Sequence, residues 1–258
     1  MELVDSHCHL EPKDFGDERE QVIARARDAG LVALVCVGSG ASRDEVSNAV
    51  ALAESHVAIF AAVGIHPHDV ARAPAGALDE IERLATSHPR VVAVGETGLD
   101  YYYDHSPRDA QKDALRSFVQ IARRAHKPLQ LHIRDAHDDA LRICAEERAG
   151  EVGGSVHCFT GTADEARRWL DLGFHISFSG VVTFKSAGAL REAAALVPSE
   201  RLLVETDCPF LTPVPLRGKR NEPAYVVHTA RALAAARAVP VETIAAETTA
   251  NARRLFHL

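Results

Sequence analysis

The sequence lacks any hydrophobic run long enough to cross a membrane. No apolar stretch in its 258 residues approaches the roughly 20 residues that a membrane-spanning helix needs. The amino terminus, MELVDSHCHLEPKD, also lacks the basic start and the apolar core of a secretory signal. Five cysteines, an odd number, are scattered with no CxxC pair, so no disulfide framework is expected. These absences favour a cytoplasmic protein without a membrane anchor.

An excess of positive charge is also missing. The net charge is −7, whereas a protein that depends on nonspecific binding to nucleic-acid phosphates is more often basic. A nucleic-acid substrate would therefore be attracted locally, through a metal centre and a few arginines. No glycine-rich phosphate loop follows the first apolar run, and no linker or low-complexity tract divides the chain. We therefore expect one domain over residues 1–258.

Short apolar runs alternate with longer Ala/Leu/Arg/Glu segments along the whole chain. Near-continuous runs such as LVALVCV are typical of parallel strands that are covered on both faces. The expected strands are Leu3–Cys8, Leu31–Val37, Val57–Val63, Val91–Val94, Pro128–His132, Gly154–His157, Phe174–Phe178 and Leu202–Glu205. The expected helices are Glu18–Ala29, Ser42–Glu54, Ala75–Ser87, Pro107–Ala125, Ala136–Glu147, Ala163–Leu172, Ala187–Leu196, Ala224–Ala238 and Val241–Ala250. Eight βα units in about 250 residues predict a single (β/α)₈ TIM barrel with an extra C-terminal helix.

Metal-ligating side chains fall at the carboxyl ends of these strands, where TIM barrels assemble their active sites. His7 and His9 are two residues apart in extended chain, so both can reach one ion. Four histidines and two carboxylates give six donors, which are too many for one tetrahedral ion that keeps an open position. The six are His7, His9, Glu96, His132, His157 and Asp207.

Six donors suffice for two divalent ions if one carboxylate bridges them, and Glu96 is the natural bridge. Zn²⁺, Mn²⁺, Co²⁺ and Mg²⁺ all suit such ligands, and the sequence does not choose among them. Two neighbouring ions can clamp the attacking and leaving oxygens of a displacement. Asp207 is then placed to take the proton from the attacking water. The positive charge that remains favours an anionic substrate such as a phosphodiester.

Seven motifs in order resemble the TatD family of metal-dependent deoxyribonucleases, within the amidohydrolase superfamily. They are the HxH start, GETGLDYYY, HIRDA, HCFTG, ETDCPFLTP, RGKRNEPAYV and TTANARRLF, and they run from Val4 to Phe256. The resemblance implies the same six metal ligands, with Glu96 bridging and with Glu205 in a supporting or proton-handling role. It also implies a nuclease that shortens single-stranded DNA from its 3′ end. Thr97 departs from many relatives, which carry an apolar residue there.

Substrate contacts are less sharply defined by the sequence. His66, ahead of His68, follows the third strand and is a candidate for binding phosphate. Arg134 can present a planar fork to phosphate or can pair with Asp135 or another local carboxylate. A basic cluster of Arg217, Lys219 and Arg220 either guides a nucleic-acid strand or is an ordinary solvated loop. Tyr101, Tyr102 and Tyr103 either stack on an unpaired base or pack within the loop.

Two other functions remain open at this stage. The same dinuclear site would suit hydrolysis of ester, amide or aminoacyl bonds, because loops supply specificity on this fold. The resemblance also implies removal of D-amino acids from tRNA as an alternative, since the family includes members linked to that activity. A binding module on an inactive barrel would be expected to lack ligands, yet all six are present. Cys8, Cys158 and Cys208 adjoin proposed ligands, and we expect all three to be buried packing residues. Oligomeric state is left open.

Overall fold

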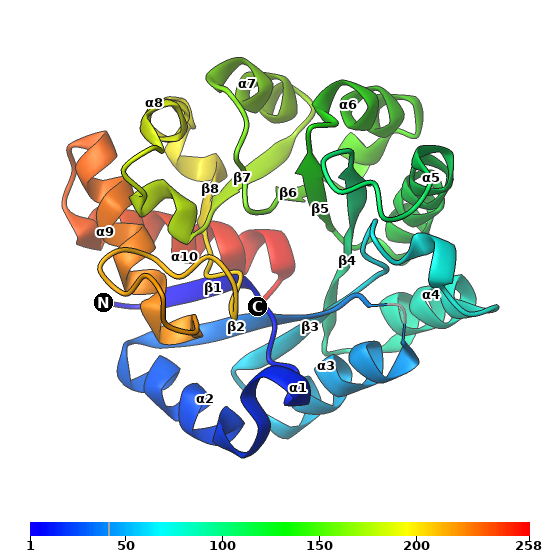
Figure 1. Cartoon of the computed structure of the whole chain (residues 1–258), viewed down its shortest axis with the longest axis horizontal. Helices are drawn as coiled ribbons and strands as arrows, with labels where there is room; N and C mark the ends of the chain where they lie inside the picture. The colour runs from blue at the N-terminus through cyan, green and yellow to red at the C-terminus, as the bar shows by residue number, and fades with distance from the viewer. Residues whose placement is uncertain (41) are drawn as a thin grey trace. The chain divides into compact units, whose positions relative to one another are not determined.

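The computed structural model describes residues 1–40 and 42–258. Parallel strands are separated by helices along the chain (Figure 1). The strands are β1 (Leu3–Cys8), β2 (Leu31–Gly38), β3 (Ile59–Val63), β4 (Val91–Asp100), β5 (Leu129–Arg134), β6 (Gly154–Val156), β7 (Phe174–Phe178) and β8 (Leu202–Val204). They are hydrogen-bonded in the order β1 to β8 in one eight-stranded sheet. This is the strand order of a (β/α)₈ fold.

The helices cover the strands, and every expected helix except the last ends within one residue of its predicted position. They are α1 (Pro12–Phe15), α2 (Arg19–Asp28), α3 (Arg43–Ser55), α4 (Ala77–Ser87), α5 (Arg108–Ala125), α6 (His137–Glu146), α7 (Ala163–Asp171), α8 (Gly188–Leu196), α9 (Val226–Arg237) and α10 (Val241–Phe256). Ser42 caps α3 by accepting from the backbone N–H of Asp44, as its residue type predicts. Thr162 and Glu165 form a reciprocal capping box at the start of α7. No helix among the described residues is long and apolar enough to cross a membrane.

Some predicted boundaries are wrong. The third strand begins at Ile59 instead of Val57, which is 91% exposed in a turn. The fourth strand runs on from Val94 to Asp100, so Glu96 lies inside the strand and not beyond it. The last helix extends past Ala250 to Phe256, and the short helix α1 was not expected.

Contacts divide the chain into two compact parts, which are described separately. The terminal unit comprises Met1–Val35, His157–Leu170 and His175–Leu258. Within it, α10 packs against β1 and β8. The amide of Asn251 on α10 donates to the carbonyl oxygens of Ser199 and Leu202 at the start of β8. These contacts fix the strands whose carboxyl ends carry His7 and Asp207.

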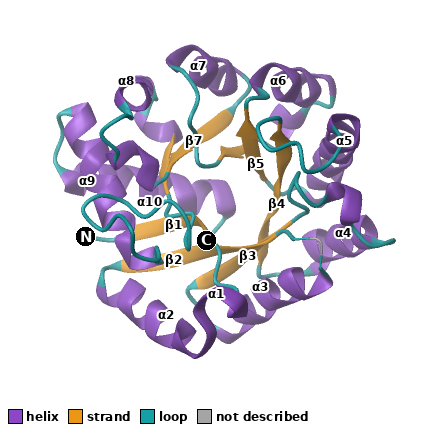
Figure 2. Ribbon diagram, in the orientation of Figure 1, coloured by secondary structure: helices purple, strands orange, loops and turns teal. Residues whose placement is uncertain are grey.

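The central unit comprises Cys36–Val156 and Asp171–Phe174. Its strands β3, β4, β5 and β6 pair in parallel, with helices along one side of them (Figure 2). Helix α5 lies against β4. Its buried face includes Leu115, Phe118 and Ala122, which recur at the three- and four-residue spacing of one helix face. Burial of this face holds β4 and the acidic residues it carries in place.

Candidate metal centre

The first group of ligands lies in the terminal unit, at the end of β1. His7 is fully buried, and its Nε2 lies 3.3 Å from Nε2 of His9. Oδ1 of Asp207 lies 3.7 Å from Nε2 of His7 and 3.6 Å from Nε2 of His9. The backbone N–H of Asp207 donates to the carbonyl oxygen of His7, which ties the segment after β8 to β1. Three donors therefore converge closely enough to hold one cation.

His157 joins this group from the end of β6. Its ring is stacked on the ring of His7, with centroids 3.8 Å apart and planes 5° from parallel. Nδ1 of His157 lies 3.4 Å from Oε1 of the fully buried Glu205. The backbone N–H of Cys158 donates to the same Oε1, and Ser177 donates to Oε2. Both oxygens of Glu205 are thus engaged, which suits a carboxylate that orients the imidazole of His157.

Asp5 is a buried carboxyl group that sequence reasoning missed. It accepts from the backbone N–H and the hydroxyl of Thr206 and from the backbone N–H of His7. Burial raises the pKa of Asp5 to about 8, because it outweighs the hydrogen bonds from Thr206. Asp5 therefore joins β1 to the segment that leads to Asp207.

The second group lies in the central unit and is centred on Glu96. The register of β4 and β5 pairs Gly95 with Gln130 and Thr97 with Leu131, which leaves Glu96 as an extra residue in a bulge. Its Oε1 lies 3.1 Å from Nδ1 of His132 and 3.4 Å from Nε2 of His66. Its Oε2 accepts from the hydroxyl of Ser39 at 3.3 Å. The bulge places a carboxylate where two imidazoles meet.

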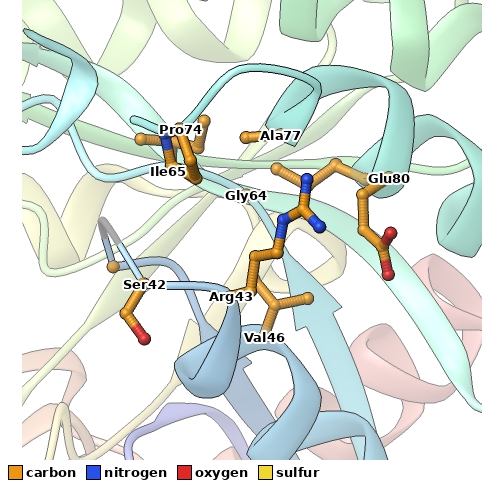
Figure 3. A pocket seen from close by; sticks show the side chains of 10 residues that line it. Ser42, Arg43, Val46, Gly64, Ile65, Pro74, Ala77 and Glu80 are labelled. Atoms are coloured by element: carbon orange, nitrogen blue, oxygen red, sulfur yellow. The ribbon is translucent and has the colours of Figure 1, made fainter. Parts of the chain in front are cut away.

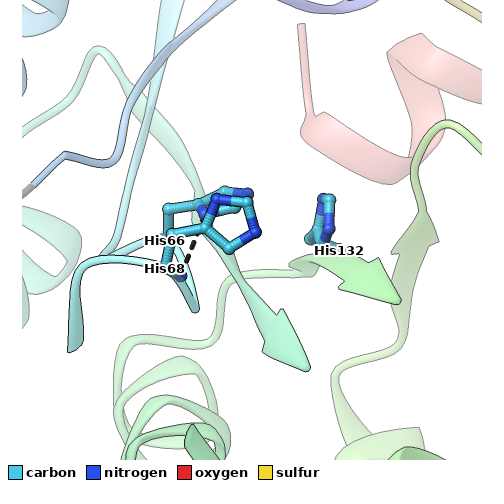
Figure 4. A group of neighbouring side chains, drawn as sticks. All are labelled: His66, His68 and His132. Carbon is cyan, nitrogen blue, oxygen red and sulfur yellow. Dashed lines mark hydrogen bonds between the residues drawn. The ribbon is translucent and has the colours of Figure 1, made fainter. Parts of the chain in front are cut away.

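His66, His68 and His132 form a cluster (Figure 4), and both His66 and His132 lie close to Glu96. The ring centroids of His66 and His68 are 4.3 Å apart, and those of His66 and His132 are 4.5 Å apart. Burial lowers the pKa of His66 below its ordinary value, although Glu96 acts in the opposite direction. A neutral ring is the form that binds a metal ion.

Asp100, at the end of β4, fixes two of these rings. Its Oδ2 accepts from Nε2 of His68 at 2.8 Å and from Nε2 of His132 at 3.1 Å. Its Oδ1 accepts from the backbone N–H groups of Tyr102 and Tyr103. Burial acts to raise the pKa of Asp100, but the hydrogen bonds from His132, Tyr103 and His68 outweigh it and hold the pKa below its ordinary value. Asp100 is therefore an ionised acceptor.

This arrangement gives a test of whether a cation fits the central group. Because His132 donates through Nε2 to Asp100, its Nδ1 presents a lone pair to Oε1 of Glu96. Two acceptors 3.1 Å apart repel each other unless a proton or a cation lies between them. Imidazole and carboxylate are ordinary ligands of Zn²⁺ and related ions. The residues therefore fit a divalent metal ion.

The predicted substrate-binding residues lie in varied surroundings. The guanidinium of Arg134 lies over the rings of Tyr102 and Tyr103. Arg217 lies over the ring of Phe184 at 4.0 Å and donates to the carbonyl oxygen of Thr212. Arg220 pairs with Glu18, and Lys219 is exposed. All three residues of the basic cluster are exposed, and the role of all four cations stays a prediction.

The three cysteines beside the ligands differ in exposure. Cys8 and Cys208 are buried, as expected. Cys158 is only half-buried, so its assignment as a buried packing residue is wrong. Its backbone takes a φ of 42°, and its Sγ lies 3.2 Å from Oγ of Ser179. The turn at Cys158 brings its N–H to Glu205, which explains why the side chain leaves the buried face of the strand.

Two cavities are lined by residues other than these ligands. One of about 20 Å³ is lined by Arg43, Ile65 and Glu80 among others, and has room for about one water molecule (Figure 3). A larger groove of about 320 Å³ is lined by Met1, Glu2 and residues of α10. Met1 and Glu2 precede β1, whereas active sites on this fold lie at the carboxyl ends of the strands. Neither cavity is the candidate active site.

Comparison with known proteins identifies the family. Residues 4–257 match the family described as TatD related DNase. A protein of Bacillus subtilis named as the uncharacterized metal-dependent hydrolase YabD is 43% identical over 256 residues, which is 99% of each chain. A protein of a Pantoea species named 3′-5′ ssDNA/RNA exonuclease TatD is 38% identical over 262 residues, covering 99% of this chain and 100% of that protein.

A solved structure gives the fold independently. The TatD homologue YjjV from Escherichia coli K12 superposes with a TM-score of 0.93 at 29% identity, over 99% of this chain and 98% of that one. The likeness confirms the (β/α)₈ fold class that the alternation of strands and helices predicts. The family match runs through the ligand motifs that the sequence placed at the strand ends.

Proposed function

Because the chain belongs to the TatD-related DNase family of metal-dependent hydrolases, we propose that it is a 3′-5′ exodeoxyribonuclease acting on single-stranded ends. One observation carries the proposal, namely that Nδ1 of His132 lies 3.1 Å from the carboxylate of Glu96 while Nε2 of the same ring faces Asp100. These two groups are ordinary ligands of a divalent ion, and His7, His9 and Asp207 form a second ligand group. The exonuclease named in the Pantoea species supports the choice of DNA as substrate.

Two divalent ions would be held by His7, His9, His157 and Asp207 in the terminal unit and by Glu96 and His132 in the central unit. That Glu96 bridges the two ions stays a prediction. Bound ions of this kind lower the pKa of a coordinated water and polarise a phosphoryl oxygen. The donor set is mixed imidazole and carboxylate, which Zn²⁺, Mn²⁺, Co²⁺ and Mg²⁺ accept to different degrees.

The remaining chemistry falls to side chains of the chain itself. Asp207 keeps 13% of its side chain exposed, so a water molecule can reach it and pass a proton to its carboxylate. Glu205 has both oxygens occupied by Cys158 and Ser177, and it holds the ring of His157 in place. Glu205 thus acts as a positioning residue, and Asp207 is the proton acceptor.

The test is cleavage of a 5′-labelled single-stranded oligodeoxynucleotide with Mg²⁺, Mn²⁺ or Zn²⁺, resolved at single-nucleotide spacing. We expect a metal-dependent ladder that shortens from the 3′ end and disappears with EDTA. Asp207→Asn should abolish the ladder, while Asp164→Asn, at an exposed aspartate on α7, should leave it unchanged. A ladder of equal intensity in folded Asp207→Asn protein would overturn the role of Asp207.

The same preparation separates the alternative reaction. If the protein binds about two ions per chain but cleaves no oligonucleotide with any metal, the nuclease proposal fails and the metal site stands. Aminoacyl-tRNA and simple esters would then be assayed under the same conditions. Release of an amino acid from charged tRNA, blocked by Asp207→Asn, would establish the aminoacyl alternative.

A further inference from the structure

An arginine lies against two exposed tyrosine rings in the loop after β4. The guanidinium carbon of Arg134 is 4.0 Å from the ring centroid of Tyr102 and 4.8 Å from that of Tyr103. The two rings meet edge to face, with centroids 4.8 Å apart at 88°. Tyr102 is 59% exposed and Tyr103 is 48% exposed. Large aromatic rings left this open to water call for an explanation, because folding alone would favour burying them.

The backbone beneath these rings is held firmly. The N–H groups of Tyr102 and Tyr103 both donate to Oδ1 of Asp100, at 3.0 and 2.9 Å. The ring of Tyr103 also stacks on His105, with centroids 5.4 Å apart and planes 14° from parallel. The rings are therefore set in place before any ligand arrives, which reduces the entropy lost on binding.

The same carboxylate links the rings to the metal ligands of the central unit. Oδ2 of Asp100 accepts from His68 and from His132, which faces Glu96. The centroid of the Tyr103 ring lies 5.3 Å from that of His68. A group resting on the tyrosines would therefore lie beside the histidine cluster, within the length of a nucleotide.

We propose that Tyr102, Tyr103 and Arg134 form a stacking platform for an unpaired nucleobase. The platform would hold the base of a strand whose phosphate is engaged at the histidine–carboxylate group, so this inference rests on the proposed nuclease function. Every base has a π-face, so stacking on tyrosine tolerates any sequence. The guanidinium adds attraction for the electron-rich face of a base and for its phosphate.

The chemistry of the patch favours a base over an apolar protein partner. A protein-docking surface buries several hundred Å² on each side and has an apolar centre, whereas the centre of this patch is a cation. Arg134 uses its flat face against Tyr102, which leaves its N–H edge to donate hydrogen bonds. A flat π-surface beside a donor edge matches a nucleotide.

Binding is tested without catalysis. Protein in EDTA is titrated into a short single strand that carries 2-aminopurine at its 3′ end, because the fluorescence of this base is quenched when it stacks on an aromatic ring. We expect Tyr102→Leu and Tyr103→Leu to lose most of the quenching, and Tyr102→Phe to retain it. The matched control is Phe60→Leu. Phe60 forms a similar stack with Arg90, whose guanidinium carbon lies 4.1 Å from the ring centroid.

Hydrolysis gives a second measurement on the holoenzyme. One oligonucleotide ends in a normal 3′ nucleotide and the other in an abasic one, which has no base to stack. We expect the wild-type protein to have a KM lower by about 5- to 100-fold for the normal end. In Tyr102→Leu this preference should largely vanish, because the KM for the normal end should rise towards the KM for the abasic end.

The outcomes separate this inference from the nuclease proposal. If no strand is cleaved but 2-aminopurine is quenched in a Tyr102-dependent way, the platform stands and the nuclease proposal fails. If strands are cleaved but the preference for a terminal base survives in Tyr102→Leu and Tyr103→Leu, the platform is overturned. Equal loss of quenching in Phe60→Leu would also overturn it, since the effect would then not belong to these tyrosines.

Discussion

Nε2 of His132 lies 3.1 Å from Oδ2 of Asp100, and this contact decides which nitrogen of His132 faces Glu96. An ionised carboxylate only accepts, so it holds the imidazole proton on Nε2 and turns Nδ1, the nitrogen that would bind a metal ion, towards Glu96. Carboxylate–histidine–metal arrangements of this type fix the orientation of the ligand ring and raise its basicity. Asp100 is thus as much a part of the centre as the ligands themselves.

Replacing Asp100 with asparagine should weaken metal binding without unfolding the protein. The amide has only one accepting oxygen, whereas Asp100 accepts on both, from two imidazoles and from two backbone N–H groups. Loss of such a partner typically costs about 10- to 100-fold in metal affinity. Calorimetric titration of the metal-stripped protein would measure the metal affinity. Asp104→Asn, at an exposed position nearby, is the control. Unchanged affinity in Asp100→Asn would show that His132 needs no partner.

Removal of the metal should lower the thermal stability. A ligand at 100 times its Kd stabilises the folded state by about 2.7 kcal/mol, which in a chain of this size is worth roughly 5–10 °C in Tm. We expect the Tm to fall by that order in EDTA and to recover when Zn²⁺ or Mn²⁺ is restored. Asp207→Asn, which removes a carboxylate ligand of the terminal group, should show a smaller fall in Tm on addition of EDTA. A Tm that EDTA does not change would contradict a resident metal.

The fold was largely predictable from the sequence, because parallel strands that are covered on both faces appear in the sequence as continuous apolar runs. LVALVCV and VVAV identified β2 and β4, and the helix caps at Ser42 and Thr162 lay where their residue types predict. The continuation of β4 to Asp100 was missed because GETGLD contains two glycines and two acids, which are untypical of a strand. A bulge accommodates them.

The sequence predicted the candidate ligands and one neighbouring carboxylate, Glu205, but not the other side chains that contact the ligands. His7, His9 and Asp207 were predicted because the HxH spacing and the position at a strand end can be recognised from the sequence alone. Asp100, Ser39, Ser177 and Asp5 were missed because their roles depend on contacts between distant strands. The one sequence feature that indicated a role for Asp100 was its position at the end of the GETGLD motif. The exposure of Tyr102 likewise could not be predicted, because it depends on the path of the loop after β4.

Stability in acid should depend on Asp139. Hydrogen bonds from Arg142 and from the hydroxyl of Tyr101 lower the pKa of Asp139 from 3.8 to about 2. A carboxyl whose pKa is depressed by folding stabilises the native state above pH 3.8, and this contribution is lost as the pH falls towards 2. Since the Asp139 carboxylate is partly exposed, we expect it to contribute about 1 kcal/mol or less to the free energy of unfolding.

Urea unfolding between pH 5 and pH 2 would measure this contribution. Asp139→Asn should be less stable than the wild type at pH 5, and the difference should shrink as the pH approaches 2. Asp113→Asn, at an exposed position on α5, serves as the control. A difference that stays constant over the whole pH range would mean that Asp139 acts through packing and not through its charge.

Gly98 should tolerate no side chain, because it sets the distance between β4 and His132. A Cβ at Gly98 would lie 1.9 Å from the carbonyl oxygen of His132, and its φ of +146° is a conformation that L-residues rarely adopt. Gly98→Ala must therefore displace β5 at the residue that faces Glu96. We expect a loss of about 2 to 4 kcal/mol in unfolding free energy.

The displacement should also reach the metal centre, since the distance from Nδ1 of His132 to Oε1 of Glu96 depends on the pairing of Gly98 with His132. Gly188→Ala is the matched control, because a Cβ there would meet nothing within 4 Å at the start of α8. Denaturant unfolding and metal titration of both variants would be compared. If Gly98→Ala binds metal as tightly as Gly188→Ala, the position of His132 does not depend on the close approach of the two strands.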